Sequence, residues 1–186
     1  MDVQVTLERV SSATPAARML VEELELVLSA EYPPEQRHGL AIDAIFQPFI
    51  HFYVASLEGE PVGCGAVALL DGFAELKRMY VRPAMRGTGV AVALVGRLAA
   101  VAAAAGYRVL RLETGDAQHA ALRFYAREGF VRCGVFGPYV AMAPETIETS
   151  VFMEKPLQTD HDDGRIRDYG AEPVRLKRKP VAPSVE

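Results

Sequence analysis

Hydrophobic and polar residues follow two rhythms in the first part of this chain, one typical of strands and one typical of helices. Within 3–9, the apolar residues Val3, Val5 and Leu7 alternate with polar ones, as in a half-buried strand. After Thr14-Pro15, which offers a capping hydroxyl and a proline for the first helical turn, leucine recurs every four residues up to about Ala30. The pattern therefore predicts a strand followed by a long amphipathic helix.

The period falls to two again in the middle of the chain, where strands are predicted over 49–57, 61–70 and 73–81. The connections Glu58-Gly59-Glu60 and Asp71-Gly72 are typical of hairpin turns. The remaining predicted elements are a short helix over 40–46, a helix over 88–105, a strand over 109–113, a helix over 117–128, and closing strands over 131–136 and 149–155. This order of strands and helices predicts a single domain of the α/β (α+β) class.

Composition agrees with one soluble domain and excludes several kinds of partner. The 186 residues are 50% hydrophobic, and a net charge of −4 with a pI near 5.6 gives no footprint for nucleic acid. No apolar run reaches the length of a membrane span, and the first residues resemble neither a signal peptide nor a transit peptide. Cys64 and Cys133 are too few for a disulfide framework and indicate a reducing compartment. We expect a cytoplasmic protein that binds neither nucleic acid nor a membrane.

The segment 82–91 carries the strongest chemical signal in the sequence. A strand stops there at a proline, and a glycine-spaced turn then opens an alanine-rich helix. Gly87 and Gly89 would let a phosphate reach the backbone where unpaired N–H groups and the positive end of the helix dipole converge. Arg86 and Thr88 add a fixed charge and a hydroxyl. The expected ligand carries a pyrophosphate.

Two common phosphate-binding motifs do not fit this segment. The loop of nucleoside triphosphatases needs a lysine after its second glycine, and none follows Gly87 or Gly89. The dinucleotide fingerprint needs a third glycine, where Val92 stands, and it joins strand to turn directly, whereas residues 82–86 intervene here.

The remaining pattern resembles the GNAT superfamily of acyl-CoA-dependent N-acyltransferases. Arg86-x-x-Gly89-x-Ala91 resembles its pyrophosphate loop, and the segment 121–130 resembles its second motif, an apolar helix with a tyrosine four residues before Gly-Phe. The resemblance implies the GNAT fold, with a mixed central sheet and helices on both faces. It also implies an N-acetyltransferase domain over 1–156, and the polar segment 157–186 is expected to be a mobile tail or a strap on the surface.

The resemblance further implies that acetyl-CoA is the acyl donor. In the superfamily, the strand before the turn separates from its neighbour, so that main-chain groups pair with the pantetheine amides of the cofactor. The implied cofactor-binding residues are Met79, Tyr80, Val81, Arg86, Gly87, Thr88, Gly89, Val90, Ala91, Gln118 and Tyr125. Gln118 departs from the family pattern, in which asparagine is frequent at this position.

Transfer of an acyl group from a thioester to an amine requires a base for the amine, donors for the oxyanion and an acid for the thiolate. By resemblance, Tyr125 is the general acid; the alternative is a core tyrosine whose hydroxyl has an ordinary carbonyl partner. The main-chain N–H of Met79 or Val81 is a candidate donor to the oxyanion.

Glu75 is the candidate base. Strand alternation puts it on the same face as Met79 and Val81, which meets the cofactor, and a partly apolar cleft would raise its pKa. Histone-type members of the superfamily carry their catalytic glutamate at a similar distance. The alternative is that Glu75 pairs at the surface with Lys77 or Arg78.

Glu113 is either a second base or a structural carboxylate. No cluster of His, Cys and Asp has the spacing of metal ligands, so no metal is expected. Together these features predict direct transfer of an acetyl group to a primary amine of a small molecule.

Two other functions stay open. A protein acetyltransferase, acting on a lysine or an N-terminal amine, would need an open groove lined by Tyr32, 40–48 and 136–139. A non-catalytic acyl-CoA-binding regulator would lack polar groups near the thioester carbon. If the protein self-associates, a homodimer is the commonest arrangement.

Overall fold

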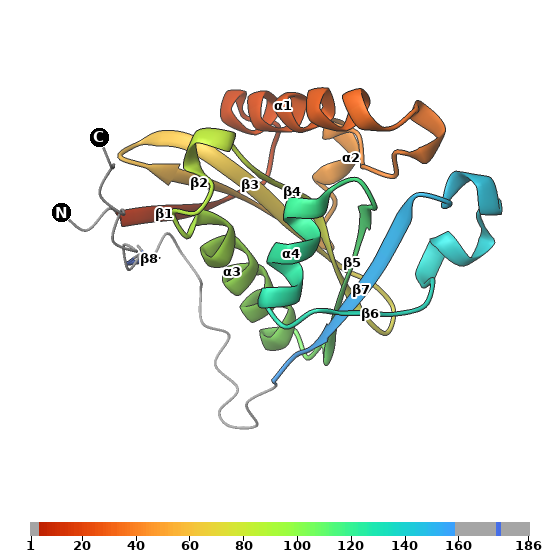
Figure 1. Cartoon of the computed structure of the whole chain (residues 1–186). Helices are drawn as coiled ribbons and strands as arrows, with labels where there is room; N and C mark the ends of the chain where they lie inside the picture. Colours follow the sequence, from red (N-terminus) through yellow and green to blue (C-terminus); the bar gives the residue numbers. More distant parts are fainter. Residues whose placement is uncertain (1–3, 159–173, 176–186) are drawn as a thin grey trace, which may run out of the picture.

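A mixed sheet forms the centre of the molecule in the computed structural model, which describes residues 4–158 and 174–175 (Figure 1). Its eight strands lie in the order β6-β7-β5-β4-β3-β2-β1-β8. Neighbouring strands are antiparallel except for β4 and β5, which are parallel. The strands are β1 (Gln4–Val10), β2 (Ile50–Leu57), β3 (Glu60–Leu69), β4 (Ala74–Val81), β5 (Val109–Gly115), β6 (Val131–Arg132), β7 (Ser150–Pro156) and β8 (Val174–Arg175). The predicted mixed sheet is confirmed.

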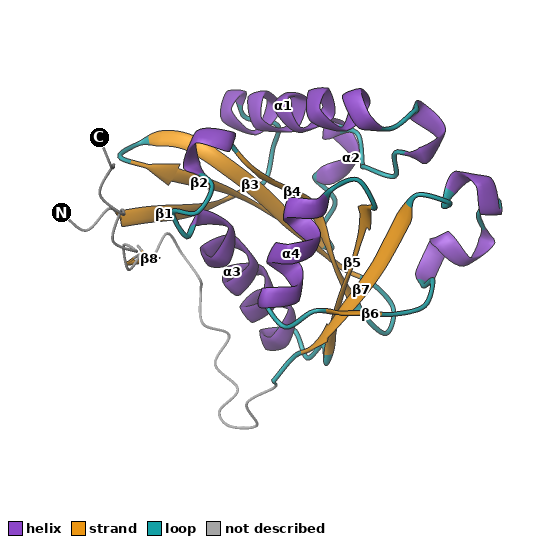
Figure 2. Cartoon of the chain, viewed as in Figure 1, coloured by secondary structure: helices purple, strands orange, loops and turns teal. Residues whose placement is uncertain are grey.

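Helices cover both faces of the sheet, as the resemblance implied (Figure 2). The helices of one face are α1 (Pro15–Glu31) and α2 (Ile42–Ile45), and those of the other are α3 (Val90–Ala104) and α4 (His119–Arg127). Each face has its own core. Phe52 packs in the core under α1, whereas the next residue, Tyr53, packs in the core under α3, because successive strand side chains point to opposite faces. Short 3₁₀ turns lie at η1 (Pro34–Gln36), η2 (Pro83–Met85), η3 (Gly137–Ala141) and η4 (Pro144–Thr146).

The helix starts follow local rules that the sequence already contained. The Thr14 hydroxyl accepts a hydrogen bond from the Ala17 N–H at 3.2 Å, so the predicted cap of α1 is confirmed. α3 begins directly after Gly89, whose φ of +96° lies in the left-handed region that glycine adopts without strain.

Two elements are shorter than predicted, and one was not predicted. The helix expected over 40–46 is the single turn of α2, and the strand expected over 131–136 pairs only at Val131–Arg132. Two glycines interrupt the strand expected over 131–136. Gly134 lies within it, and Gly137 follows it and begins the η3 turn with a φ of +51°. β8 adds two residues of the polar tail to the edge of β1, and the rest of that tail lies outside the described residues.

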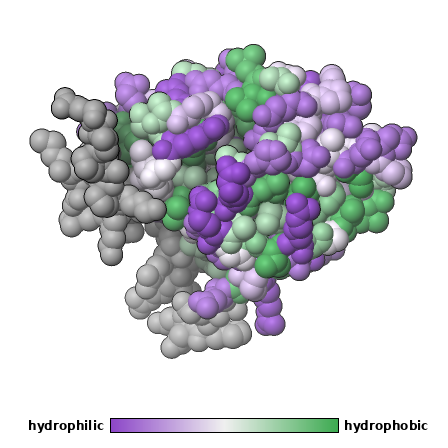
Figure 3. Space-filling model, in the orientation of Figure 1, coloured by the Kyte–Doolittle hydropathy of each residue, from purple (hydrophilic) through white to green (hydrophobic). Residues whose placement is uncertain are grey.

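The surface mixes polar and apolar residues. On the face shown in Figure 3, apolar patches are separated by hydrophilic side chains. Among the described residues, no helix combines the length and the apolar character needed to cross a membrane.

Candidate active site

A β-bulge in β4 shapes the centre of the site. Arg78 and Met79 of β4 together lie opposite the single residue Gly65 of β3, and Arg78 has a φ of +55°. The extra residue shifts the alternation of side chains along the second half of the strand. Side chains of β4 after the bulge therefore point to the opposite face of the sheet from the one that regular alternation along the strand would predict.

This bulge makes one sequence prediction wrong. Met79 and Val81 pack against the same core as Leu76, under α3 and α4. Glu75 precedes Leu76 in a regular stretch of strand and points to the opposite face. Glu75 therefore does not share a face with Met79 and Val81.

β4 and β5 separate in the middle of the sheet, as the resemblance implied. They pair only from Ala74 with Leu110 to Leu76 with Leu112, although β4 continues to Val81 and β5 to Gly115. A cleft of about 130 Å³ opens where they part. Residues of β4, β5 and α4 line it, together with Leu24 and Leu28 of α1 and residues of the segment from Tyr32 to Gly39. We call this the catalytic cleft.

Tyr125 of α4 lines the catalytic cleft and is only 7% exposed. Burial raises the pKa of its hydroxyl, and the nearby charge of Glu113 raises that pKa further. The hydroxyl therefore stays protonated throughout the working range of pH. It is therefore available as a hydrogen-bond or proton donor to a departing thiolate.

Glu113, at the end of β5, also lines the catalytic cleft. Burial raises the pKa of its carboxyl group, while a hydrogen bond that the Ser150 hydroxyl donates at 2.6 Å and the charges of His38 and Lys77 act in the opposite direction. A carboxylate with a raised pKa that faces a cleft has the properties of a general base.

Glu75 has a different environment. It is 1% exposed, its carboxylate lies 2.7 Å from Lys77 Nζ, and the Tyr139 hydroxyl donates a hydrogen bond to it at 2.8 Å. Lys77 also donates to the Tyr139 oxygen at 2.6 Å, which closes a triangle of three polar groups. Lys77 lines the cleft, whereas Glu75 is not among the residues that line it. The expected partner Lys77 is thus present, although the pair is buried and does not lie at the surface.

Tyr139 was not predicted as a partner of Glu75. It lies 64 residues away in the chain, on η3, and the sequence near either residue gives no signal of the contact. Its hydroxyl is held against the carboxylate of Glu75. Burial and the negative charge of Glu75 together raise the pKa of Tyr139.

The glycine turn lies between η2 and α3 and is open on its outer side. Gly87 has a φ of +80°, and a side chain placed there would meet no atom within 4 Å. Arg86, Gly87 and Thr88 are exposed, whereas Val90 packs into the core and fixes the first turn of α3. The Thr88 hydroxyl donates to the Met85 carbonyl at 2.7 Å, so it stabilises the turn itself.

Two further predicted residues have partners within the protein. Gln118 lines the cleft and its side-chain amide donates to the Glu31 carboxylate at the end of α1. The Tyr80 side chain packs under α1, so a contact with a cofactor between β4 and β5 would have to come from its main chain. Among the residues that the structure describes, no group of three or more His, Cys, Asp or Glu side chains is arranged to hold a metal ion.

Comparisons with known proteins agree with this geometry. The model of the Acetyltransferase (GNAT) family matches residues 18–130. An IAA acetyltransferase of Azospirillum brasilense is 41% identical over 155 residues, which are 82% of this chain and 98% of that protein. A crystal structure from Klebsiella pneumoniae, described as an acyl-CoA N-acyltransferase, has a TM-score of 0.65 at 32% identity and covers 83% of this chain and 98% of its own. A GNAT acetyltransferase of Elizabethkingia anophelis with acetyl-CoA bound shares the fold, with a TM-score of 0.60 at 20% identity, covering 82% of this chain and 98% of its own.

Proposed function

The chain belongs to the GNAT family of acetyltransferases, and from this premise we propose that it transfers the acetyl group of acetyl-CoA directly to a primary amine of a small molecule. The observation that carries the proposal is the separation of β4 and β5 beside the glycine turn, with Glu113 and Tyr125 in the cleft between them.

The proposed donor fits two features of this chain. The open turn at Gly87 and the N-terminus of α3 offer main-chain N–H groups to a pyrophosphate. The separated edges of β4 and β5 leave room for an extended chain between them. Acetyl-CoA would supply an activated thioester at the inner end of this path. Its binding along Met79–Val81 and Arg86–Ala91 remains our proposal.

Glu113 and Tyr125 divide the proton transfers between them in the proposed reaction. The Glu113 carboxylate accepts a proton from the amine of the acceptor, directly or through water, as the new C–N bond forms. The C–S bond breaks, and the Tyr125 hydroxyl donates its proton to the departing sulfur. Glu113 then releases its proton to solvent and Tyr125 takes one up, so both groups return to their starting states before the next cycle. Main-chain N–H groups of Met79 or Val81 remain the candidate donors to the developing oxyanion.

The geometry favours Glu113 over Glu75 as the base. The Glu75 carboxylate is already paired with the Lys77 ammonium and hydrogen-bonded by the Tyr139 hydroxyl. Glu75 is also not among the residues that line the cleft. We propose that Glu75 fixes the position of the Lys77 ammonium, and its direct role as a base stays a prediction to be tested.

A small acceptor fits the site better than a protein substrate. Three aromatic residues expected to line an open groove are buried instead, since Tyr32 is 6%, Phe136 4% and Tyr139 2% exposed, although most of 40–48 is half-buried or exposed. The Tyr32 hydroxyl also accepts a hydrogen bond from the Ala117 N–H at 2.8 Å, which joins the covering segment to the start of α4. The relative from Azospirillum brasilense carries IAA in its name, which favours a small-molecule acceptor as well. A non-catalytic regulator is disfavoured by Glu113 and Tyr125.

A panel assay tests the proposal. Purified protein would be mixed with acetyl-CoA and a set of small amines, lysine peptides and N-terminal peptides, and release of free thiol would be measured. We expect release with one or more small amines, and a strong reduction in the Tyr125→Phe variant. Faster release with peptides than with every small amine would contradict the proposed acceptor class.

A further inference from the structure

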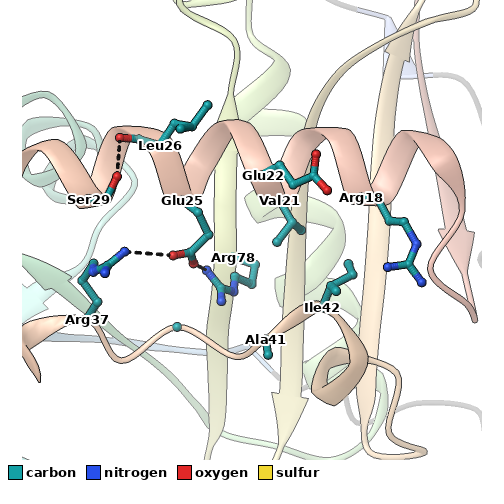
Figure 4. Close-up of a pocket in the computed structure, with 11 residues that line it drawn as sticks. Arg18, Val21, Glu22, Glu25, Leu26, Ser29, Arg37, Ala41, Ile42 and Arg78 are labelled. Carbon is teal, nitrogen blue, oxygen red and sulfur yellow. Dashed lines mark hydrogen bonds and ion pairs between the residues drawn. The ribbon is translucent and has the colours of Figure 1, made fainter. Parts of the chain in front are cut away.

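A second, larger cavity lies next to the catalytic cleft. It has a volume of about 690 Å³ and lies between α1, from Arg18 to Ser29, and the segment 37–42, with Arg78 of β4 at its inner wall (Figure 4). We call it the α1 pocket. Its volume is in the range of small-molecule sites, whereas the catalytic cleft is much smaller.

The inner wall of the α1 pocket carries more positive than negative charge. Arg37 and Arg78 both bind the carboxylate of Glu25, so two guanidinium groups share one carboxylate (Figure 4). The Arg78 side chain is 4% exposed, and its guanidinium also donates to the Leu40 carbonyl. The β-bulge, at which Arg78 adopts a φ of +55°, is part of what aims this side chain at α1.

Arg37 is the group that an added ligand can reach. Its side chain is 23% exposed, and its side-chain hydrogen bond within the described residues is a long one of 3.4 Å to Glu25. A guanidinium has five N–H donors, so most of those of Arg37 remain available, and its buried Nε has no partner in the described part of the chain. A second carboxylate beside Arg37 would balance the charge of this wall.

The other groups of the pocket limit the kind of anion. Val21 and Ile42 face each other across the cavity and provide an apolar surface (Figure 4). Arg18 and Glu22 lie at the rim with opposite charges, and Arg18 is only weakly paired with Asp43, at 3.8 Å and in solvent. Among the residues that line the pocket, three arginines against two glutamates leave a surplus of one positive charge next to an aliphatic surface.

We propose that the α1 pocket binds a small organic monocarboxylate, with the carboxylate on Arg37 and the aliphatic body between Val21 and Ile42. Arg37, Gly39 and Arg78 line both this pocket and the catalytic cleft, so the two cavities share a wall. The monocarboxylate is either the tail of the acetyl acceptor or a separate ligand that acts through this wall.

Direct binding tests the site without any assumption about catalysis. Hexanoate and its neutral isostere hexanamide would be titrated calorimetrically into the full 186-residue chain. We expect saturable binding of one hexanoate with a Kd of about 5 mM or less, and binding of hexanamide at least about tenfold weaker. Equal binding of the two, or no saturable binding of hexanoate up to about 50 mM, would overturn the proposal.

Variants locate the bound hexanoate. Arg37→Ala and, as a second variant that keeps Arg37, Ile42→Glu should each weaken hexanoate binding about tenfold or more. Arg132→Ala, which removes one exposed positive charge on β6, is the matched control and should leave the Kd within about twofold. Glu113→Gln should also leave it within about twofold, since Glu113 lines only the cleft. Tighter binding in Glu113→Gln would put hexanoate in the cleft and would refute the site.

Inhibition kinetics separate the two sources of the carboxylate, and this arm alone rests on the proposed acetyltransferase function. Hexanoate that raises the KM of the amine without changing kcat identifies the pocket as the site of the acceptor's tail. Hexanoate that changes kcat at saturating amine identifies a separate ligand. Failure of every amine to react would contradict the proposed acetyltransferase function. The hexanoate titrations would still show whether the α1 pocket binds a monocarboxylate.

Discussion

Replacing each of two glutamates by glutamine should separate a catalytic carboxylate from a structural one. Glu113 lines the catalytic cleft with a pKa raised by burial, whereas Glu75 is 1% exposed and pairs with Lys77 at 2.7 Å. Glutamine keeps the shape of either side chain and removes only the ability to hold a charge or a proton. We expect Glu113→Gln to reduce the rate and Glu75→Gln to reduce the stability.

The expected sizes follow from the surroundings of each carboxylate. Glu75→Gln leaves the Lys77 ammonium, 15% exposed, without its counter-ion. Breaking a buried pair in this way costs about 3–5 kcal/mol, and we expect about 2–4 here because Lys77 keeps Tyr139 and some solvent. Glu113→Gln breaks no ion pair of the described residues and keeps an acceptor for Ser150, so the free energy of unfolding should change by less than about 1 kcal/mol. Loss of the base should lower kcat/KM by about 10²–10⁴.

The pH dependence gives an independent readout. A base must be unprotonated, so the wild-type rate should fall as pH decreases through the pKa of Glu113, which lies above the ordinary carboxyl value. Glu113→Gln should lose the limb at the pKa of Glu113 and keep only a rise of the rate at higher pH, where free amine is abundant. Glu75→Gln should keep the limb. The measurements are kcat/KM between pH 5 and 10 and urea unfolding at pH 7.

The opposite pattern would refute this reasoning. If Glu75→Gln unfolds at the wild-type urea concentration but loses the rate and the acid limb, Glu75 is the base. Glu113 would then be a structural carboxylate held by Ser150.

Further substitutions test the other parts of the site. Tyr125→Phe should keep the affinity for acetyl-CoA and lower kcat by about 10²–10⁴, measured by calorimetry and thiol release; a full-rate variant would make water the acid. Gly89→Asp should weaken acetyl-CoA binding by about tenfold or more, because it adds a side chain and a negative charge at a φ of +96°; unchanged affinity in a folded variant would remove the proposed pyrophosphate site. Gly115→Ala should destabilise the protein by about 1–3 kcal/mol in urea unfolding, because its Cβ would overlap the Tyr32 hydroxyl; a neutral result would mean that Tyr32 moves aside freely.

The sequence alone determined the features that depend on neighbouring residues. The cap at Thr14, the glycine turn before α3 and the order of elements follow from hydrogen bonds and backbone preferences within a few residues. The glycine turn and the Tyr125 helix were recognisable for the same reason, since each is one continuous segment. The short range of these interactions is what makes them readable from a single sequence.

The tertiary structure decided which charged groups meet in the cleft. Because of the bulge at Arg78, Glu75 and Met79 face opposite sides of the sheet, and no local pattern in the sequence of β4 predicted the bulge. The partners of the two glutamates, Tyr139 and Ser150, come from η3 and β7, 64 and 37 residues away. Such contacts depend on how strands are ordered and paired, and a shift by one residue in register exchanges the faces of a strand. The identity of the base therefore became arguable only when β4, β5 and β7 were brought together in one sheet.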